Sequence, residues 1–154
     1  MKQLTVKKEG QAFKIYTDEK LHSEILFDDN NIDASLLTES KTLRAEKGSN
    51  KDVVLKEGDQ TLFTFTFDYV WGGAEITSNG VDTGFDIKGR WFKPGTHLTD
   101  EYDKDLIIAV KNNDGLYVTV LDEDISYTMI VATIYYHIYA SGGKMLAVLA
   151  GNVH

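Results

Sequence analysis

The chain has 154 residues, a formal net charge of −8 and no cysteine. This length fits one domain with a single core, and the lack of cysteine excludes disulfides, thiolate metal ligands and cysteine nucleophiles. The acidic balance argues against nucleic acid, because phosphate recognition requires a basic surface. We therefore expect one domain over residues 1–154 with no nucleic-acid partner.

The chain begins with alternating polar and apolar residues. Residues 1–8 contain no apolar run of the kind found in signal peptides, so we expect a first strand and a cytoplasmic protein, which the lack of cysteine also favours. The same alternation recurs at residues 11–16, 61–67 and 115–120. In the middle segment, Phe63, Phe65 and Phe67 share one face and threonines share the other, which predicts a half-buried strand.

Turn signals separate these segments. Glycine, asparagine and aspartate tolerate the backbone of tight hairpin turns, and they occur at four expected tips: Glu9-Gly10, Glu57-Gly58-Asp59, Asn79-Gly80 and residues 112–115. A further turn is expected at residues 91–95, around the single proline, Pro94. Many short strands at this spacing, up to about Leu121, favour an antiparallel barrel or sandwich over βαβ units.

The last thirty residues differ from the rest. Acidic residues 122–124 precede an apolar run over residues 125–140, and Gly142-Gly143 follow. These flanks are typical of helix ends, whereas the Ile, Val, Thr and Tyr content favours a strand. The length of the run favours the helix, which must be enclosed because it is apolar nearly all round. The run is shorter than the ~20 residues of a bilayer span, so we expect a buried helix and no transmembrane span.

Short antiparallel strands followed by one very hydrophobic helix resemble the tubby C-terminal-like superfamily, which includes tubby, the LURP-one-related proteins and the phospholipid scramblases. The resemblance covers nearly the whole chain, is most visible from Gly84 to Ile138, and is closest to the small bacterial single-domain members. It implies a mainly β fold, a closed antiparallel barrel of about twelve strands enclosing the helix, which we place at about residues 125–141. Such a barrel has no interior space for a ligand.

A short cationic stretch is the nearest approach to a ligand site. Lys88, Arg90 and Lys93 flank Trp91 and Phe92, and residues 88 and 90 share one strand face. One hypothesis is that these cations bind a phosphate-bearing head group. Tubby is a phosphoinositide-binding module, but no basic cluster of this chain matches its lipid pocket residue by residue. The alternative is a solvated strand face with its aromatic residues turned inward, since isolated cation pairs are common on surfaces. A second, looser basic stretch contains Lys41, Arg44 and Lys47.

Other candidate sites have plainer interpretations. Residues 100–105 offer acidic oxygens to a calcium ion but lack the glycine and the closing glutamate of a calcium loop, so we interpret them as a hairpin tip. His137 is expected to be buried, neutral and bonded to a barrel backbone group. The remaining histidines, His22, His97 and His154, are too dispersed for a metal site.

No catalytic motif occurs, since the chain has neither a nucleophile elbow nor a phosphate-binding glycine loop. We therefore expect a non-enzymatic binding or interaction module with no cofactor and no metal, whose partner is a phospholipid head group or a protein. The alternative is a hollow barrel that carries a small apolar ligand, or an enzyme built on one. That alternative requires residues 125–140 to form a strand or to lie outside the barrel.

Overall fold

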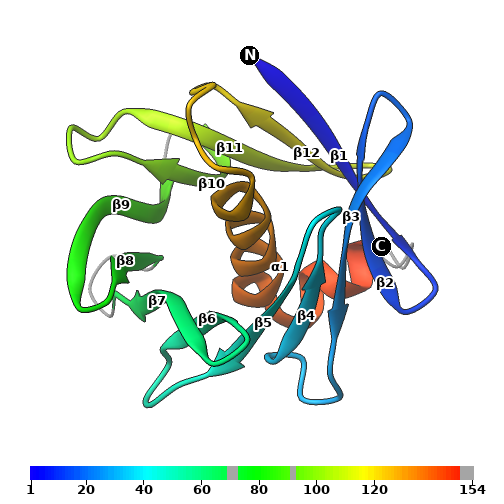
Figure 1. The fold of residues 1–154 in the computed structure, drawn as a ribbon. Helices are drawn as coiled ribbons and strands as arrows, with labels where there is room; N and C mark the ends of the chain where they lie inside the picture. The colour runs from blue at the N-terminus through cyan, green and yellow to red at the C-terminus, as the bar shows by residue number, and fades with distance from the viewer. Residues whose placement is uncertain (69–72, 91–92, 150–154) are drawn as a thin grey trace.

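Twelve strands pair in chain order, each antiparallel to the next, and β12 pairs with β1 to close a barrel (Figure 1). The computed structural model describes residues 1–68, 73–90 and 93–149, without the side chains of residues 90, 93 and 142–149. The strands are β1 (Lys2–Glu9), β2 (Ala12–Thr17), β3 (Lys20–Phe27), β4 (Ala34–Leu37), β5 (Thr42–Lys47), β6 (Val53–Glu57), β7 (Gln60–Phe67), β8 (Ala74–Ser78), β9 (Val81–Arg90), β10 (Lys93–Thr99), β11 (Asp105–Asn112) and β12 (Gly115–Val120). One helix, α1 (Tyr127–Leu149), follows. The predicted fold class is confirmed.

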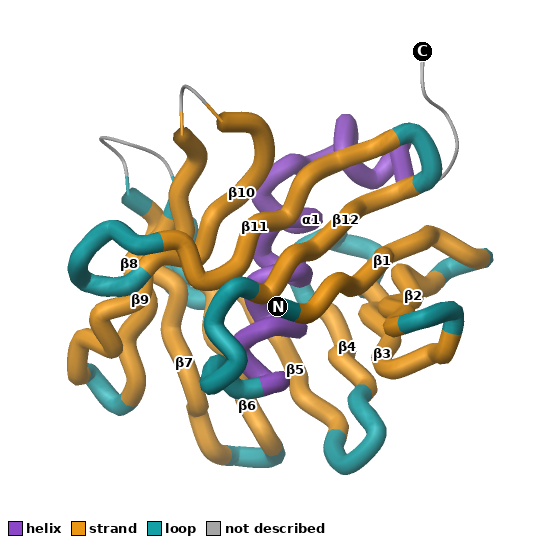
Figure 2. The backbone as a smooth tube through the Cα atoms, turned by 90° about the horizontal axis from the view of Figure 1, so that it is seen from above, coloured by secondary structure: helices purple, strands orange, loops and turns teal. Residues whose placement is uncertain are grey.

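The helix occupies the inside of the barrel, as the view from above in Figure 2 shows. Its side chains contact strands on different sides of the wall. The Tyr135 hydroxyl donates to the carbonyl of Ile32 at 2.6 Å, after β3, and the Tyr136 ring lies 5.2 Å from that of Phe65 on β7. Both tyrosines are almost fully buried. The barrel wall therefore encloses the apolar helix, which explains how a helix of this composition avoids water.

The predicted hairpin tips are confirmed. The tip between β8 and β9 has Asn79 and Gly80 at φ 54° and 78°, and those after β1 and β6 have Gly10 and Gly58 at φ 63° and 59°. These are left-handed values that asparagine and glycine adopt at low cost.

The expected turn around Pro94 needs a correction. β9 ends at Arg90, which pairs with Lys93, and Pro94 already belongs to β10. The register shifts between Lys93 and Thr96, which is a bulge, one of the few places where a strand accepts proline. Trp91 and Phe92, which the predicted turn includes, lie outside the described residues, and so does Trp71.

The phenylalanines of β7 differ in burial. Phe65 is fully buried and Phe63 packs against the edge of the core. The ring of Phe67 lies 5.0 Å from the ammonium of Lys51 at the end of the strand, where a cation can cover an aromatic face. The predicted inward face is therefore confirmed, and its last residue lies at the rim.

Both ends of the helix differ from expectation. No acidic residue lies in the first turn of α1; instead, Ser126 caps the helix and accepts a bond from the Met129 amide at 3.1 Å. Glu123 lies in the preceding loop, where its carboxylate pairs with the amino terminus of Met1 at 3.0 Å. The helix also continues past residues 142–143 to Leu149, because the good helix formers that follow compensate for two glycines.

In the described part of the chain, no helix is both long enough and apolar enough to cross a membrane.

Candidate functional site

The histidine of the central helix lies in the barrel interior. His137 is 5% exposed, and its Nδ1 bonds the side-chain hydroxyl of Thr96 on β10. The expected backbone partner was therefore wrong, since a threonine that points into the barrel takes its place. Burial lowers the pKa of His137 to about 4, because the apolar interior disfavours the charged ring. The imidazole is neutral at pH 7, as expected.

A second buried histidine was not predicted. His97 on β10 is fully buried, and its Nδ1 lies 3.1 Å from a carboxylate oxygen of Asp105 on β11. A histidine and a carboxylate are two of the three members of a nucleophilic triad. The third is missing, since no hydrogen-bond partner for His97 Nε2 occurs among the described residues. The pairing of β10 with β11 brings His97 and Asp105 together, so the spacing of these residues in the sequence did not indicate the contact.

The predicted cationic stretch contains one side chain that the structure describes, Lys88. Its ammonium lies 2.8 Å from a carboxylate oxygen of Asp103, and both side chains are partly exposed. The side chains of Arg90 and Lys93 lie outside the described residues. An anionic ligand at Lys88 would therefore have to replace an existing ion pair.

In the second basic stretch, the charge of Arg44 is also balanced by a carboxylate. Arg44 forms a two-point pair with the Asp28 carboxylate and donates to the Ser35 hydroxyl at 2.9 Å. This pair holds the pKa of Asp28 below its usual value, chiefly through the hydrogen bond from Arg44.

The acidic run is a hairpin tip, as interpreted. One Asp100 carboxylate oxygen accepts bonds from the backbone amides of Tyr102 and Lys104, both at 2.9 Å, between β10 and β11. Asp103 pairs with Lys88 and Asp105 lies against His97. Across the whole described part of the chain, no group of three or more acidic, histidine or cysteine side chains could hold a metal ion.

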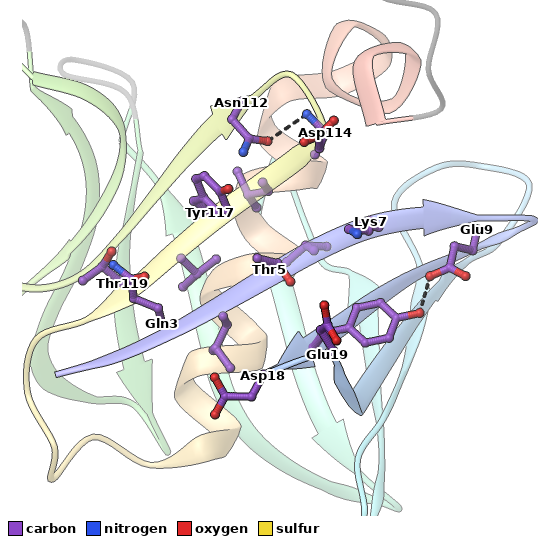
Figure 3. Close-up of a pocket in the computed structure, with 16 residues that line it drawn as sticks. Gln3, Thr5, Lys7, Glu9, Asp18, Glu19, Asn112, Asp114, Tyr117 and Thr119 are labelled. Atoms are coloured by element: carbon purple, nitrogen blue, oxygen red, sulfur yellow. Dashed lines mark hydrogen bonds between the residues drawn. The ribbon is translucent and has the colours of Figure 1, made fainter.

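A groove of about 750 Å³ lies on the outer wall over β1, β2 and β12, and we call it the outer-wall groove (Figure 3). Leu4 and Val6 of β1 are buried in the core, so Thr5 between them points outward. On β12 the same alternation exposes Tyr117, which is 55% exposed. The polar side chains along the groove are Gln3, Thr5, Lys7, Glu9, Tyr16, Asp18, Glu19, Asn112, Asp114, Tyr117 and Thr119.

Two hairpin turns border the groove. Figure 3 shows Asn112 and Asp114 on one side of β1, and Asp18 and Glu19 on the other. The turn between β2 and β3 has Asp18 at φ 51° and Glu19 at φ 68°. Two consecutive left-handed residues normally call for Asn-Gly or Asp-Gly, so the glutamate at the second position is unfavourable for the turn itself. On the other border, the Asn112 side chain accepts the Asp114 amide at 3.1 Å.

The groove is acidic. Four carboxylates line it, from Glu9, Asp18, Glu19 and Asp114, against one ammonium from Lys7; a second lysine, Lys14, lies beside Lys7 on the neighbouring strand. Glu9 accepts a hydrogen bond from the Tyr16 hydroxyl, and this bond is the main reason that the pKa of Tyr16 is raised. The other three carboxylates make no ion pair with any described residue.

Sequence reasoning did not identify this groove. Its residues come from the first hairpin, near 3–9 and 16–19, and from the last hairpin of the barrel, near 112–119. They meet only because β1 pairs with β12 on one side and with β2 on the other, with Thr5 opposite both Tyr117 and Tyr16. The alternation around Thr5 and Tyr117 was a signal that these side chains point outward, but the barrel closure that brings them together follows from the complete strand order.

Neither a protein-family profile nor a curated protein matches the sequence. The structure is similar to an X-ray structure of a protein from Arabidopsis thaliana, with a TM-score of 0.66, 15% sequence identity and 88% of each chain covered. At this level of identity the likeness shows a shared fold and does not extend to function.

Proposed function

We propose that this protein is a non-enzymatic interaction module that binds a protein partner in the outer-wall groove. The supporting observation is the combination of a filled interior with a groove outside. Helix α1 occupies the space that a carrier barrel would leave for its ligand, whereas about 750 Å³ on the outer wall is accessible beside an exposed tyrosine. Exposed tyrosines are enriched at protein interfaces.

The absence of catalytic groupings in the described part of the chain supports the non-enzymatic part of the proposal. No described residue places a nucleophile at the second ring nitrogen of the His97–Asp105 pair. His137 bonds a threonine inside the barrel, where water and substrate have little access. General acid–base catalysis requires a titrating group within hydrogen-bond reach of its substrate, and neither histidine meets this condition.

A protein partner fits the groove better than a phospholipid head group does. The groove lining is acidic, and an anionic head group would be repelled by it. At the cationic stretch, Lys88 is paired with Asp103, so its charge is already balanced. The proposal includes membership of the tubby C-terminal-like superfamily, supported by the closed twelve-stranded barrel around a C-terminal helix, and a cytoplasmic location, supported by the lack of cysteine.

Peptide selection followed by surface mapping tests the proposal. A random-peptide display library is selected against the immobilised protein, and the selected peptides are titrated into isotopically labelled protein. We expect amide shift changes at Thr5 and Tyr117, loss of binding in Tyr117→Ala, and retained binding in Thr64→Ala on β7, on the opposite side of the barrel. Selection of no peptide, or shift changes confined to other surfaces, would contradict the proposal.

Vesicle co-sedimentation tests the phospholipid alternative. Wild type and a Lys88→Glu, Arg90→Glu variant are compared on neutral and on phosphoinositide-containing vesicles. We expect neither protein to sediment with either vesicle. Sedimentation of wild type with phosphoinositide vesicles alone, lost in the variant, would replace the protein partner with a phospholipid.

A further inference from the structure

We infer that the outer-wall groove accepts an extended, lysine- or arginine-rich peptide segment of its partner. This inference rests on the proposed function and names the chemistry of the partner. It follows from the shape of the groove, its charge and the closure of the barrel.

The shape of the groove suits an extended segment. The groove follows β1 from Gln3 to Lys7, which is about 13 Å at the ordinary rise of a strand. This length corresponds to roughly four or five residues of extended peptide. Its volume of about 750 Å³ falls within the range of known ligand sites. The two bordering turns, at Asp18 on one side and Asp114 on the other, limit its width.

The charge of the groove selects cations. Three carboxylates, from Asp18, Glu19 and Asp114, lie along the borders without an ion pair to any described residue. The exposed ring of Tyr117 lines the same groove, and a guanidinium or ammonium is attracted both to carboxylates and to an aromatic face. A net charge of −8 on the chain adds long-range attraction for a basic partner. Lys7 is then expected to set the register, because it repels a cation at one end of the segment.

Barrel closure determines how the segment is recognised. Many proteins bind an extended peptide by adding it to an open sheet edge. Here β1 is paired on both sides, with β2 and β12, so its backbone offers no row of unpaired groups. The segment must therefore be held by side-chain contacts across the face of the sheet, and its affinity must depend on salt.

Fluorescence anisotropy with defined peptides tests the inference. The probes are labelled nonapeptides of alternating arginine and serine, and of alternating glutamate and serine, with spermidine as a competitor. We expect binding of the arginine peptide, no binding of the glutamate peptide, and at least tenfold weaker binding when NaCl is raised from about 0.05 M to about 0.5 M. Spermidine should compete only weakly, because it carries fewer positive charges than the arginine peptide and no guanidinium group.

A charge-removing variant separates loss of binding from loss of folding. Asp18→Asn, Glu19→Gly removes two carboxylates and installs the pair that this turn prefers, so it should be at least as stable as wild type. We expect it to bind the arginine peptide about three- to thirtyfold more weakly, and Tyr117→Ala to bind at least tenfold more weakly. The matched control, Glu57→Gln, Asp59→Asn, removes the same charge on the tip between β6 and β7, on the opposite side of the barrel, and should bind as wild type does.

Four results would overturn the inference. These are no binding of the arginine peptide, equal binding of the glutamate peptide, equal loss of binding in the control variant, and competition by spermidine at the affinity of the peptide. The last result would identify a small polycation instead. If neutral or acidic peptides from the random library bind at Thr5 and Tyr117, the proposed function stands and the inference fails. If no selected peptide binds in the groove, the proposed function itself fails.

Discussion

Replacing His137 with glutamine should change how the stability of the protein depends on pH. The glutamine oxygen can still accept the hydroxyl of Thr96, which now bonds His137 Nδ1, but glutamine does not titrate. At pH 7 we expect His137→Gln to be less stable than wild type by about 1–2 kcal/mol, as is usual for a change at a buried, packed position.

The sign of the pH effect follows from the direction of the shift. Burial lowers the pKa of His137 from 6.5 to about 4, so between these values the unfolded chain binds a proton that the folded chain does not. The stability present above pH 6.5 is therefore lost as the pH falls toward 4. A pKa difference of this size lowers the free energy of unfolding by about 3 kcal/mol near pH 4. Since this loss exceeds the cost of the substitution, the order reverses, and His137→Gln becomes the more stable protein near pH 4.

Urea unfolding followed by circular dichroism at several pH values between 7 and 4 measures this reversal. Both proteins contain the same carboxylates, so acid effects from those groups cancel in the difference. Thr133→Val is the matched control: its buried hydroxyl, one turn earlier, donates to the Met129 carbonyl at 2.8 Å and does not titrate in this range. Its offset from wild type should stay constant with pH. A constant offset for His137→Gln as well would refute the reasoning that His137 is neutral because it is buried.

Two further substitutions test the packing of the wall and of the helix. Gly95→Ala should lower the free energy of unfolding by more than about 2 kcal/mol, because Gly95 has φ +94° and an added Cβ would lie 2.3 Å from the Ala109 carbonyl oxygen. The control is Gly58→Ala, at φ +59° with open space around it, which should cost only about 1 kcal/mol. Equal costs of the two substitutions in thermal unfolding would argue against the close approach at Gly95. Tyr135→Phe should cost about 1 kcal/mol, because it removes the hydroxyl that donates to the Ile32 carbonyl. An unchanged denaturation midpoint would show that this bond contributes nothing.

The architecture was predictable because several local signals agreed. Alternation placed Phe65 inward, and Asn79-Gly80 marked a hairpin tip, both as the structure has them. The apolar run at residues 125–140 was ambiguous by propensity, and its length indicated the helix. Its exact end was not predictable, since Gly142-Gly143 are a stop signal on their own and only the residues beyond them favour continuation.

The candidate site was less accessible to sequence reasoning. Lys88 is conspicuous in the sequence, yet its charge is balanced by Asp103, which the fold brings beside it. Asp18 and Glu19 look like an ordinary polar turn, yet they border a groove formed by the first two strands in the sequence and the last one. Local patterns report which way a side chain points, whereas grooves and ion pairs depend on strand order and register.

Amide hydrogen exchange along α1 tests whether the helix fills the barrel, on which the proposed function depends. If the barrel encloses the helix, the amides of residues 130–138 should exchange only through global unfolding, as slowly as those of Leu4, Val6 and Val118 in the wall. If the helix amides exchange much faster than those of the wall, α1 leaves the interior without unfolding of the barrel. The interior would then be open to ligands, and binding on the outer wall would no longer be the favoured function.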